Sequence, residues 1–197
     1  MIDISKISKN KPNNEFVKLY CRALDSDQKI IQGMAISTFN KEKNEVDSRF
    51  VNLKYIIEDE WIFFSNYKSR KAKDIETHNQ ISAVFHWQDI NTQIRIKAHI
   101  KKTSKTFSDL HFKSRTNEKN ALAISSNQSG TIDSYSSVVK NYENVLKSKS
   151  SERPYYWGGY SFTPYYFEFW EGHNSRLNKR NAYEMKGGDW NHFILQP

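Results

Sequence analysis

Alternation of apolar and polar side chains predicts a protein built mainly from β-strands. The clearest case is TQIRIKAHIKK, residues 92–102, in which four apolar residues alternate with four polar ones. These are Ile94, Ile96, Ala98 and Ile100, and Arg95, Lys97, His99 and Lys101. Successive side chains of a strand point to opposite faces, so this segment is expected to have one face in the core and the other in water.

Six further segments are rich in β-branched and aromatic residues and also predict strands. They are GMAISTF (33–39), SRFVNLKYI (48–56), WIFFSN (61–66), ISAVFHW (81–87), YYWGGYSFTPYYFEFWEG (155–172) and DWNHFILQP (189–197). Only a charged turn separates 48–56 from 61–66, so we expect these two strands to form a hairpin. Within the aromatic stretch, Tyr155, Tyr156 and Trp157 are expected to line a barrel or a dimer contact rather than a ligand.

Helices are predicted where apolar residues recur at intervals of three and four. Residues 13–25 show this spacing, and Asn14 is a candidate N-cap. Ser69 is a candidate cap of a short predicted helix, SRKAKDIETH (69–78), whose first amide groups lack helical partners and attract anions. Residues 104–125 and 134–148 are also expected to be helical, with a polar loop between them.

This order of elements predicts one α+β domain over residues 1–197, mostly β with flanking helices. Residues 1–30 form an N-terminal helical segment and residues 104–148 a helical insertion. The strands are expected to be antiparallel and to close into a barrel or curled sheet. Twelve Phe, eleven Tyr and five Trp among 197 residues supply enough apolar surface for a core, unlike a disordered chain.

The chain has a net charge of +8, which favours anionic partners such as nucleic acid, an acidic membrane surface or phosphorylated small molecules. Its basic residues are scattered, which favours local anion sites over a nucleic-acid arm. The single cysteine excludes an intrachain disulfide framework, and no apolar run approaches the roughly 18 residues of a membrane span. The first residues lack the apolar core of a signal peptide, so a soluble cytoplasmic protein is expected.

Several common catalytic signatures are missing. No two of the six histidines have HxxxH spacing, so no metal site is expected. GxSxG, GxGxxG and P-loop motifs are also missing. The sequence offers instead cations and amides at strand ends, which together suit a phosphate and the edge of a heteroaromatic ring. They are Arg49, Lys54, Arg70, Lys71, Gln93, Gln128 and Ser129, each of which taken alone is more often a surface residue.

Five motifs in order resemble the pyridoxamine 5'-phosphate oxidase family, from about residue 33 to Pro197. They are SRFVNLK, FFSNYKSRK, TQIRIKA, SSNQS and FEFWEGHNSRLNKR. The resemblance implies a Greek-key split β-barrel homodimer that binds FMN in clefts at the subunit interface. It implies FMN contacts at Arg49, Lys54, Phe64, Ser65, Arg70, Lys71, Gln93, Gln128, Ser129, Trp170 and Arg180. Only Phe64 departs from the commoner residue, which is Tyr.

The substrate side departs further from this resemblance. Members that form pyridoxal phosphate hold the substrate phosphate with Tyr, Arg and Ser, and place an RLH triplet over its ring. This sequence has His111, Arg115 and Lys119 at the first three positions, and Arg176-Leu177-Asn178 as the triplet. The first three residues are still suited to an anion. Asn178, unlike His, cannot titrate near neutrality.

The ending WNHFILQP is similar to that of the flavin oxidases of phenazine biosynthesis, whose substrates are tricyclic carboxylic acids. The leading interpretation is therefore an FMN-dependent oxidase of a small anionic cyclic substrate, with O2 as acceptor, in secondary metabolism. The family implies that Arg176 lies over the substrate and Lys54 near the polar edge of the flavin. Three alternatives remain: a pyridoxal phosphate-forming oxidase, a flavin-binding protein without turnover, and a nucleic-acid-binding protein that stacks bases on exposed aromatic side chains.

Overall fold

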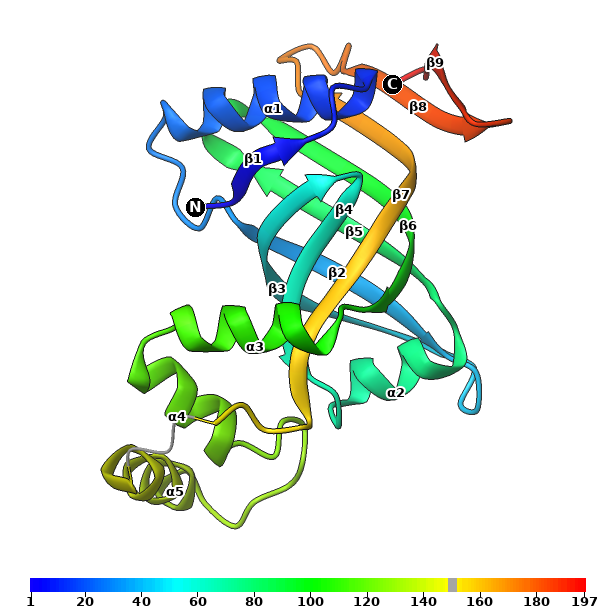
Figure 1. The fold of residues 1–197 in the computed structure, drawn as a ribbon. Helices are drawn as coiled ribbons and strands as arrows, with labels where there is room; N and C mark the ends of the chain where they lie inside the picture. Colours follow the sequence, from blue (N-terminus) through cyan, green and yellow to red (C-terminus); the bar gives the residue numbers. More distant parts are fainter. Residues whose placement is uncertain (149–151) are drawn as a thin grey trace.

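The computed structural model describes residues 1–148 and 152–197 and has a mostly-sheet α+β fold (Figure 1). The strands of these residues are β1 (Asp3–Ile7), β2 (Gly33–Asn40), β3 (Glu45–Glu58), β4 (Glu60–Asn66), β5 (Gln80–Trp87), β6 (Thr92–Lys102), β7 (Trp157–Glu171), β8 (Lys179–Lys186) and β9 (Asp189–Ile194). The helices are α1 (Lys11–Leu24), α2 (Arg70–Thr77), α3 (Lys105–Ser114), α4 (Asn117–Ser125) and α5 (Tyr135–Ser148), with a 3-10 turn over Gln88–Ile90. The predicted α+β class is confirmed.

Six strands form a closed ring of hydrogen-bonded neighbours in the order β3-β2-β5-β6-β7-β4, and β4 returns to β3. Every pairing in this ring is antiparallel, as expected. Outside the ring, β8 and β9 extend the sheet from β7, and β1 pairs with β3 in parallel. The prediction of a purely antiparallel sheet is therefore wrong at β1, which lies in a segment that was expected to be helical.

The interior of the ring is the main core. The four apolar residues of β6 are at most 4% exposed, because its alternation places them all on the inner face. Helix α1 lies across one end of the ring (Figure 1) and inserts Phe16, whose ring meets that of Trp61 edge-on with centroids 4.5 Å apart. Full burial of one such side chain contributes about 1.5–3 kcal/mol, so α1 anchors the N-terminal segment to the sheet.

Two helix boundaries differ from the prediction. The N-cap of α1 is Asn10, whose side-chain oxygen accepts from the amide of Asn13 at 2.9 Å, while Asn14 lies inside the helix. Pro12 explains the earlier start, because proline fits the first turn of a helix. The segment 104–125 forms two helices and not one, because Arg115 is extended, with ψ at 157°. This break turns the chain and leaves Arg115 at the junction of α3 and α4.

Strand β7 connects the two ends of the molecule. Its fifteen residues cover roughly 50 Å of chain at about 3.3 Å per residue. Helices α2 to α5 gather near its start, whereas β8 and β9 lie near its other end (Figure 1). Residues close to Trp157 and residues close to Trp170 are thus far apart within one chain.

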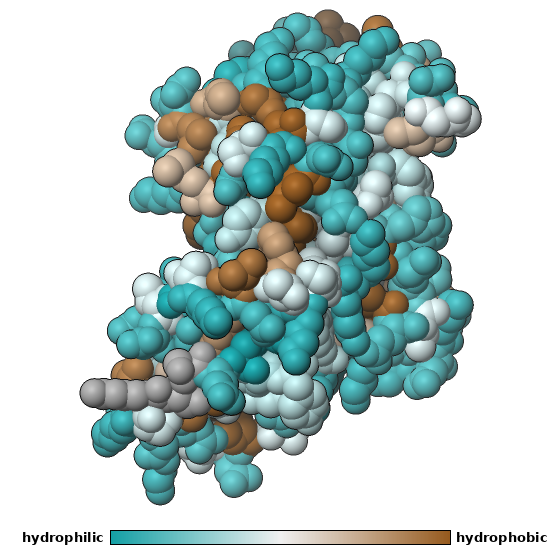
Figure 2. Space-filling model, in the orientation of Figure 1, coloured by the Kyte–Doolittle hydropathy of each residue, from teal (hydrophilic) through white to brown (hydrophobic). Residues whose placement is uncertain are grey.

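The surface is predominantly polar. Hydrophilic side chains cover most of the face shown in Figure 2, and apolar residues appear in scattered patches. None of the helices in the described residues is both long and apolar enough to cross a membrane.

Candidate active site

A cleft of about 1240 Å³ opens at the helical end of the ring. Its walls come from β3, the end of β4, the start of α2, helices α3 and α4, the loop 126–131 and the start of β7. Six of the described lining residues are cations, namely Arg49, Lys54, Arg70, Lys71, Arg115 and Lys119. Asp47 is the only carboxylate among the described residues that line the cleft. The cleft is therefore electropositive and suits an anionic ligand.

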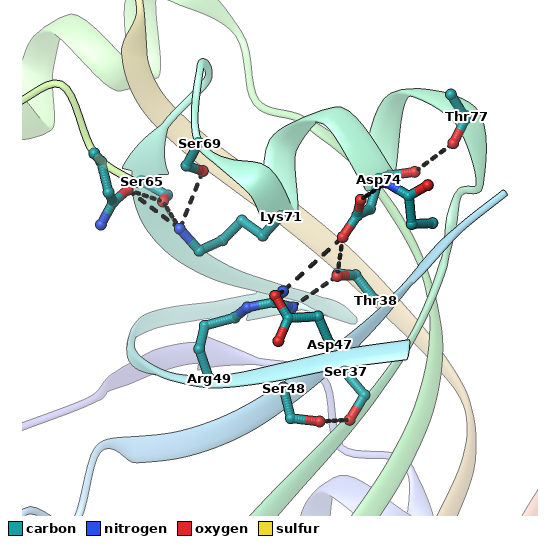
Figure 3. A network of polar contacts seen from close by, with 12 residues as sticks. Ser37, Thr38, Asp47, Ser48, Arg49, Ser65, Ser69, Lys71, Asp74 and Thr77 are labelled. Carbon is teal, nitrogen blue, oxygen red and sulfur yellow. Dashed lines mark hydrogen bonds and ion pairs between the residues drawn. The ribbon is translucent and has the colours of Figure 1, made fainter. Parts of the chain in front are cut away.

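Lys71 is one of these cations, and its side chain lies between Ser65 and Ser69 (Figure 3). It is 6% exposed, and its Nζ donates to Ser65 Oγ at 3.0 Å, Ser69 Oγ at 3.1 Å and Gln128 Oε1 at 3.2 Å. All three acceptors are neutral. Burial, followed by the charge of Arg49, lowers the pKa of Lys71 to about 8, while Asp47 acts in the opposite direction. A buried ammonium bonded to neutral groups fits the charge of a bound phosphate.

The local sequence explains how Lys71 reaches this position. Strand β4 ends at Asn66, whose Oδ1 accepts from the amide of Lys68 at 2.7 Å and closes a tight turn. Ser69 then occupies the N-cap of α2, as predicted, but its hydroxyl makes no cap hydrogen bond and donates to the carbonyl of Asn66 at 2.8 Å. The turn therefore brings the first residues of α2 beside Ser65.

Arg49 is held beside this group by a polar network (Figure 3). Its Nη1 donates to Thr38 Oγ1 at 2.7 Å, and Thr38 in turn donates to Asp74 Oδ2 at 2.7 Å. The other oxygen of Asp74 accepts from Asn40 Nδ2 at 2.8 Å. On the cleft side, Nη2 of Arg49 pairs with Asp47 Oδ2 at 2.9 Å. The guanidinium therefore has acids on two sides.

A parallel stack of rings forms another part of the cleft wall. The ring of Phe64 lies 3.7 Å from that of His111 and 5.3 Å from that of Trp157, with interplanar angles of 13° and 12°. His111 Nδ1 is 2.8 Å from Tyr55 Oη. Burial, together with Arg115 and Lys54, lowers the pKa of His111 to about 4, so its imidazole is neutral at pH 7. His111 reaches the cleft as predicted, but it offers a hydrogen bond there and no charge.

Three cations, Arg115, Lys54 and Lys119, line the cleft together with these rings. The Arg115 guanidinium lies 4.3 Å from the Trp157 ring centroid, and its Nη2 donates to the carbonyl of Lys119 at 2.8 Å. Lys54 Nζ donates to Gln32 Oε1 at 3.2 Å. Burial lowers the pKa of Lys54, and the charges of Lys119 and Arg115 lower it further. An anion bound among these three cations would relieve their mutual repulsion.

The structure thus brings together eleven of the sixteen residues predicted for the site. They are Arg49, Lys54, Phe64, Ser65, Arg70, Lys71, His111, Arg115, Lys119, Gln128 and Ser129. The other five lie outside the cleft of this chain, at the far end of β7. They are Gln93, Trp170, Arg176, Asn178 and Arg180. A single chain cannot place both groups around one small ligand.

Three of these five residues, Gln93, Trp170 and Arg180, lie side by side across the sheet and are called the far row. Gln93 of β6 is directly opposite Trp170 of β7, which is directly opposite Arg180 of β8. Arg180 is already bonded, because its Nε donates to buried Glu168 at 2.9 Å and its Nη1 to the carbonyl of Gln196 at 2.8 Å. This row is a second polar surface built from neighbouring strands.

The two residues of the RLN triplet that were predicted to face the substrate lie beside this row. Arg176 is exposed and has a φ of 60° in the loop before β8. Asn178 Oδ1 accepts from the amide of His173 at 3.0 Å. The triplet is therefore at the end of β7 opposite to the cleft.

The structure also adds lining residues that sequence reasoning missed. Trp157 was expected to line a barrel or a dimer contact, but it lies in the wall of the cleft. Asp47, which also lines the cleft, was not considered, and neither was Tyr55, which contacts His111 behind the lining. For Asp47 a signal existed, because residues two apart on a strand share a face and Asp47 precedes Arg49 by two. The placement of Trp157 depends on the packing of α3 and α4 and has no local signal.

Comparison with known proteins identifies the family. Residues 157–197 match the region described as the pyridoxine 5'-phosphate oxidase C-terminal dimerisation region. A pyridoxine/pyridoxamine 5'-phosphate oxidase of Cytophaga hutchinsonii is 38% identical over 192 residues, which cover 94% of this chain and 88% of the relative. The enzyme of the same name from Leptospira interrogans serovar copenhageni is 31% identical over 186 residues, covering 92% and 86%.

Solved structures share the fold. PhzG from Burkholderia lata 383, in complex with tetrahydrophenazine-1-carboxylic acid, superposes with a TM-score of 0.90 at 23% identity, covering 95% of this chain and 93% of that one. A pyridoxamine 5'-phosphate oxidase-related, FMN binding protein from Nostoc punctiforme gives a TM-score of 0.76 at 11% identity, covering 96% and 99%. Because the sequence relatives exceed 30% identity over nearly the whole chain, the protein belongs to the pyridoxine/pyridoxamine 5'-phosphate oxidase family and is an oxidoreductase.

Proposed function

We propose that the protein is a cytoplasmic FMN-dependent oxidase that transfers two electrons from a small anionic cyclic substrate to O2. It works as a split-barrel homodimer with FMN at the subunit interface. The observation that carries the proposal is the buried ammonium of Lys71, bonded to Ser65, Ser69 and Gln128 and to no acid among the described residues. The match of residues 157–197 to a dimerisation region supports the homodimer, and the closed ring of strands supports the barrel.

The residues present fit FMN. Lys71, Arg70 and Arg49 supply positive charge for its phosphate, and Ser65 and Gln128 supply polar atoms beside them. When bound, the isoalloxazine ring supplies the two-electron redox chemistry. Lys54 places a positive charge in the cleft near the polar edge of that ring, as the family implies. Such a fixed charge stabilises negative charge that develops during the reaction.

The substrate class follows from the aromatic part of the cleft wall and the cations beside it. Arg115 and Lys119 hold an acidic group, and the parallel rings of Phe64, His111 and Trp157 present flat surfaces suited to a cyclic substrate. His111 is neutral, so it orients a ligand by hydrogen bonding or stacking. Arg176 and Asn178 reach the substrate from the second subunit. This chain's own residues thus bind and orient the substrate and exclude water.

Mixed dimers test the shared site. Lys71→Met removes the anion site at one end of β7, and Trp170→Ala alters the far row at the other end. Each homodimer is expected to bind FMN poorly. When the two variants are dissociated, mixed and reassociated, each heterodimer regains one intact cleft and loses the other completely. We expect about half of the dimers to be heterodimers, so about a quarter of the wild-type FMN sites return. No recovery, despite heterodimers seen by native mass spectrometry, would contradict the shared site.

Anaerobic mixing with candidate substrates tests the chemistry. We expect a dihydrophenazine carboxylic acid to bleach the flavin absorbance of the loaded protein, because the cleft combines flat rings with cations. PhzG of Burkholderia lata was solved with a tetrahydrophenazine carboxylic acid, which guides the choice. This substrate class would place the protein in secondary-metabolite biosynthesis. Flavin that stays oxidised with every candidate would favour a binding protein without turnover.

A second candidate is oxidation of pyridoxine or pyridoxamine 5'-phosphate to pyridoxal 5'-phosphate. The observation in its favour is the name shared by relatives that are 31–38% identical to this chain. Against it, the substrate-facing positions carry His111, Lys119 and Asn178, which differ from the pattern of that activity. Steady-state oxidation of pyridoxamine 5'-phosphate at rates typical of enzymes, about 1 per second or faster, would establish this candidate.

A further inference from the structure

The two acids that hold Arg49 differ in how easily a ligand can replace them. The Asp74 side chain is 4% exposed, and both its oxygens accept hydrogen bonds, from Thr38 and Asn40. It acts on Arg49 through the Thr38 hydroxyl, since its own oxygen is 3.9 Å from Nη2. An acid this deeply buried and fully bonded is a fixed part of the site.

Asp47 is the opposite case. Its side chain is 55% exposed, and it lies in the cleft, where it pairs directly with Arg49 Nη2 at 2.9 Å. It is also close enough to Lys71 to raise that residue's pKa, against the effect of Arg49. Asp47 therefore partly neutralises the same two cations that are proposed to bind phosphate.

From this arrangement we infer that Asp47 is a displaceable counter-ion of the anion site. It pairs with Arg49 when no anion is bound, and an incoming phosphate must take its place. Asp74 stays and keeps the guanidinium oriented through Thr38. Asp47 thereby lowers the affinity of the cleft for phosphate-bearing ligands. The inference rests on the proposed function only for the identity of the ligand that carries the phosphate.

The hydrogen bond from Arg49 to Thr38 decides whether removing Asp47 raises or lowers the affinity for phosphate. Removing an acid beside an arginine has two consequences, since it frees the guanidinium for a ligand and also loosens it. Here the Nη1 hydrogen bond to Thr38, backed by buried Asp74, remains after Asp47 is removed. Removing Asp47 therefore frees Arg49 from a competing acid and leaves its guanidinium oriented by Thr38. Phosphate binding should become tighter as a result.

Flavin titrations of three proteins test this inference. Wild type, Asp47→Asn and the control Glu45→Gln are titrated with FMN and with riboflavin, following flavin fluorescence. Glu45 is exposed and lies two residues before Asp47 on the same strand. Its substitution makes the same change in net charge without touching the pair with Arg49. We expect Asp47→Asn to lower the Kd for FMN about 3- to 10-fold. The Kd for riboflavin, which lacks phosphate, should not change in either variant.

Inorganic phosphate separates this inference from the proposed function. The rise in Tm that phosphate causes, relative to chloride at equal ionic strength, should be larger in Asp47→Asn than in wild type. If wild type binds FMN and Asp47→Asn binds it no more tightly, the inference is wrong. If neither protein binds FMN, a larger phosphate effect in Asp47→Asn keeps the inference and rejects the proposed function, whereas an equal effect rejects both.

Discussion

The imidazole of His111 stacks on the ring of Phe64, with centroids 3.7 Å apart and an angle of 13° between the planes. Its Nδ1 is engaged with the Tyr55 hydroxyl at 2.8 Å. One face and one nitrogen of the imidazole are therefore in use before any ligand arrives. The residue is part of an aromatic wall, and the charges for an anion at this end of the cleft come from Arg115, Lys119 and Lys54.

His111 should stay neutral across the range in which most histidines titrate. Burial and the neighbouring cations lower its pKa from 6.5 to about 4. The NMR signal of its ring carbon proton is therefore expected to stay constant from pH 9 down to pH 5. In Arg115→Gln, which removes the nearby cation with the larger effect on this pKa, the pKa should rise toward 6.5. A wild-type titration centred near pH 6.5 would show that the imidazole is more solvated than its stack with Phe64 implies.

Substitution of Lys71 by Met should separate ligand binding from stability. The ammonium is buried without an acid among its hydrogen-bond partners, so its removal should leave the Tm of the flavin-free protein unchanged or higher. The Kd for FMN should rise about 10- to 100-fold, the cost of one charge-assisted hydrogen bond.

The matched control is Lys73→Met, because Lys73 is exposed on the same helix. It should change neither quantity. Equal losses of FMN affinity in the two variants would mean that only the net charge matters.

FMN affinity should fall as the pH rises above about 8. Lys71 has a pKa of about 8 in the flavin-free protein, and a bound phosphate raises it by favouring the charged form. Above pH 8, binding must therefore take up a proton, and the Kd should rise up to about tenfold per pH unit until the pKa of the complex is reached.

Fluorescence titrations between pH 7 and 10 measure this dependence. Lys71→Met should bind more weakly than wild type at pH 7, without the step near pH 8, so the two affinities should converge as the pH approaches 10. A step that persists in Lys71→Met would assign the titration to another group.

Glu168, the acid that binds Arg180 of the far row, should contribute more to stability than a more exposed acid of the same sheet. It is 2% exposed, and it accepts from Arg95 Nη1 at 2.9 Å and Arg180 Nε at 2.9 Å. Glu168→Gln removes the negative charge and leaves two cations facing each other. We expect the free energy of unfolding to fall by about 1–3 kcal/mol, because Glu168 is buried while the Arg95 and Arg180 side chains are 46% and 24% exposed and keep part of their hydration.

Urea denaturation at one fixed protein concentration measures this loss, because dimer formation makes stability depend on concentration. The comparison is Glu184→Gln, which breaks the exposed pair between Glu184 and Lys186. That loss should stay below about 1 kcal/mol. Similar values for the two variants would mean that Arg95 and Arg180 find other partners.

The sequence predicted best where one periodicity dominated. Strand β6 runs from Thr92 to Lys102, as its alternation indicates, because every second residue meets the core. Strand β8 was not predicted, since its pattern is weak and its pairing with β7 and β9 is a tertiary effect. The start of α1 was misplaced because a second Asn, at position 10, competes for the cap and Pro12 decides between them.

The sequence indicated which residues to consider for the site. It did not indicate how those residues are arranged in space. The order of the motifs indicated which side chains to consider, and eleven of the sixteen meet in one cleft. Their division between two ends of β7 is a consequence of the strand's length and has no local signal. The neutral state of His111 also depends on tertiary packing, because Phe64, Tyr55 and Arg115 are 47, 56 and 4 residues away in the chain.

The placement of Trp157 and Trp170 on the same strand has a genetic consequence. Under the proposed dimer, each chain gives the helical end of β7 to one cleft and the far end to the other. A gene copy damaged at one end only would therefore still leave one working cleft in every dimer formed with an undamaged chain. Damage at both ends would leave none, so such a doubly altered copy should act as a dominant inhibitor of its normal counterpart.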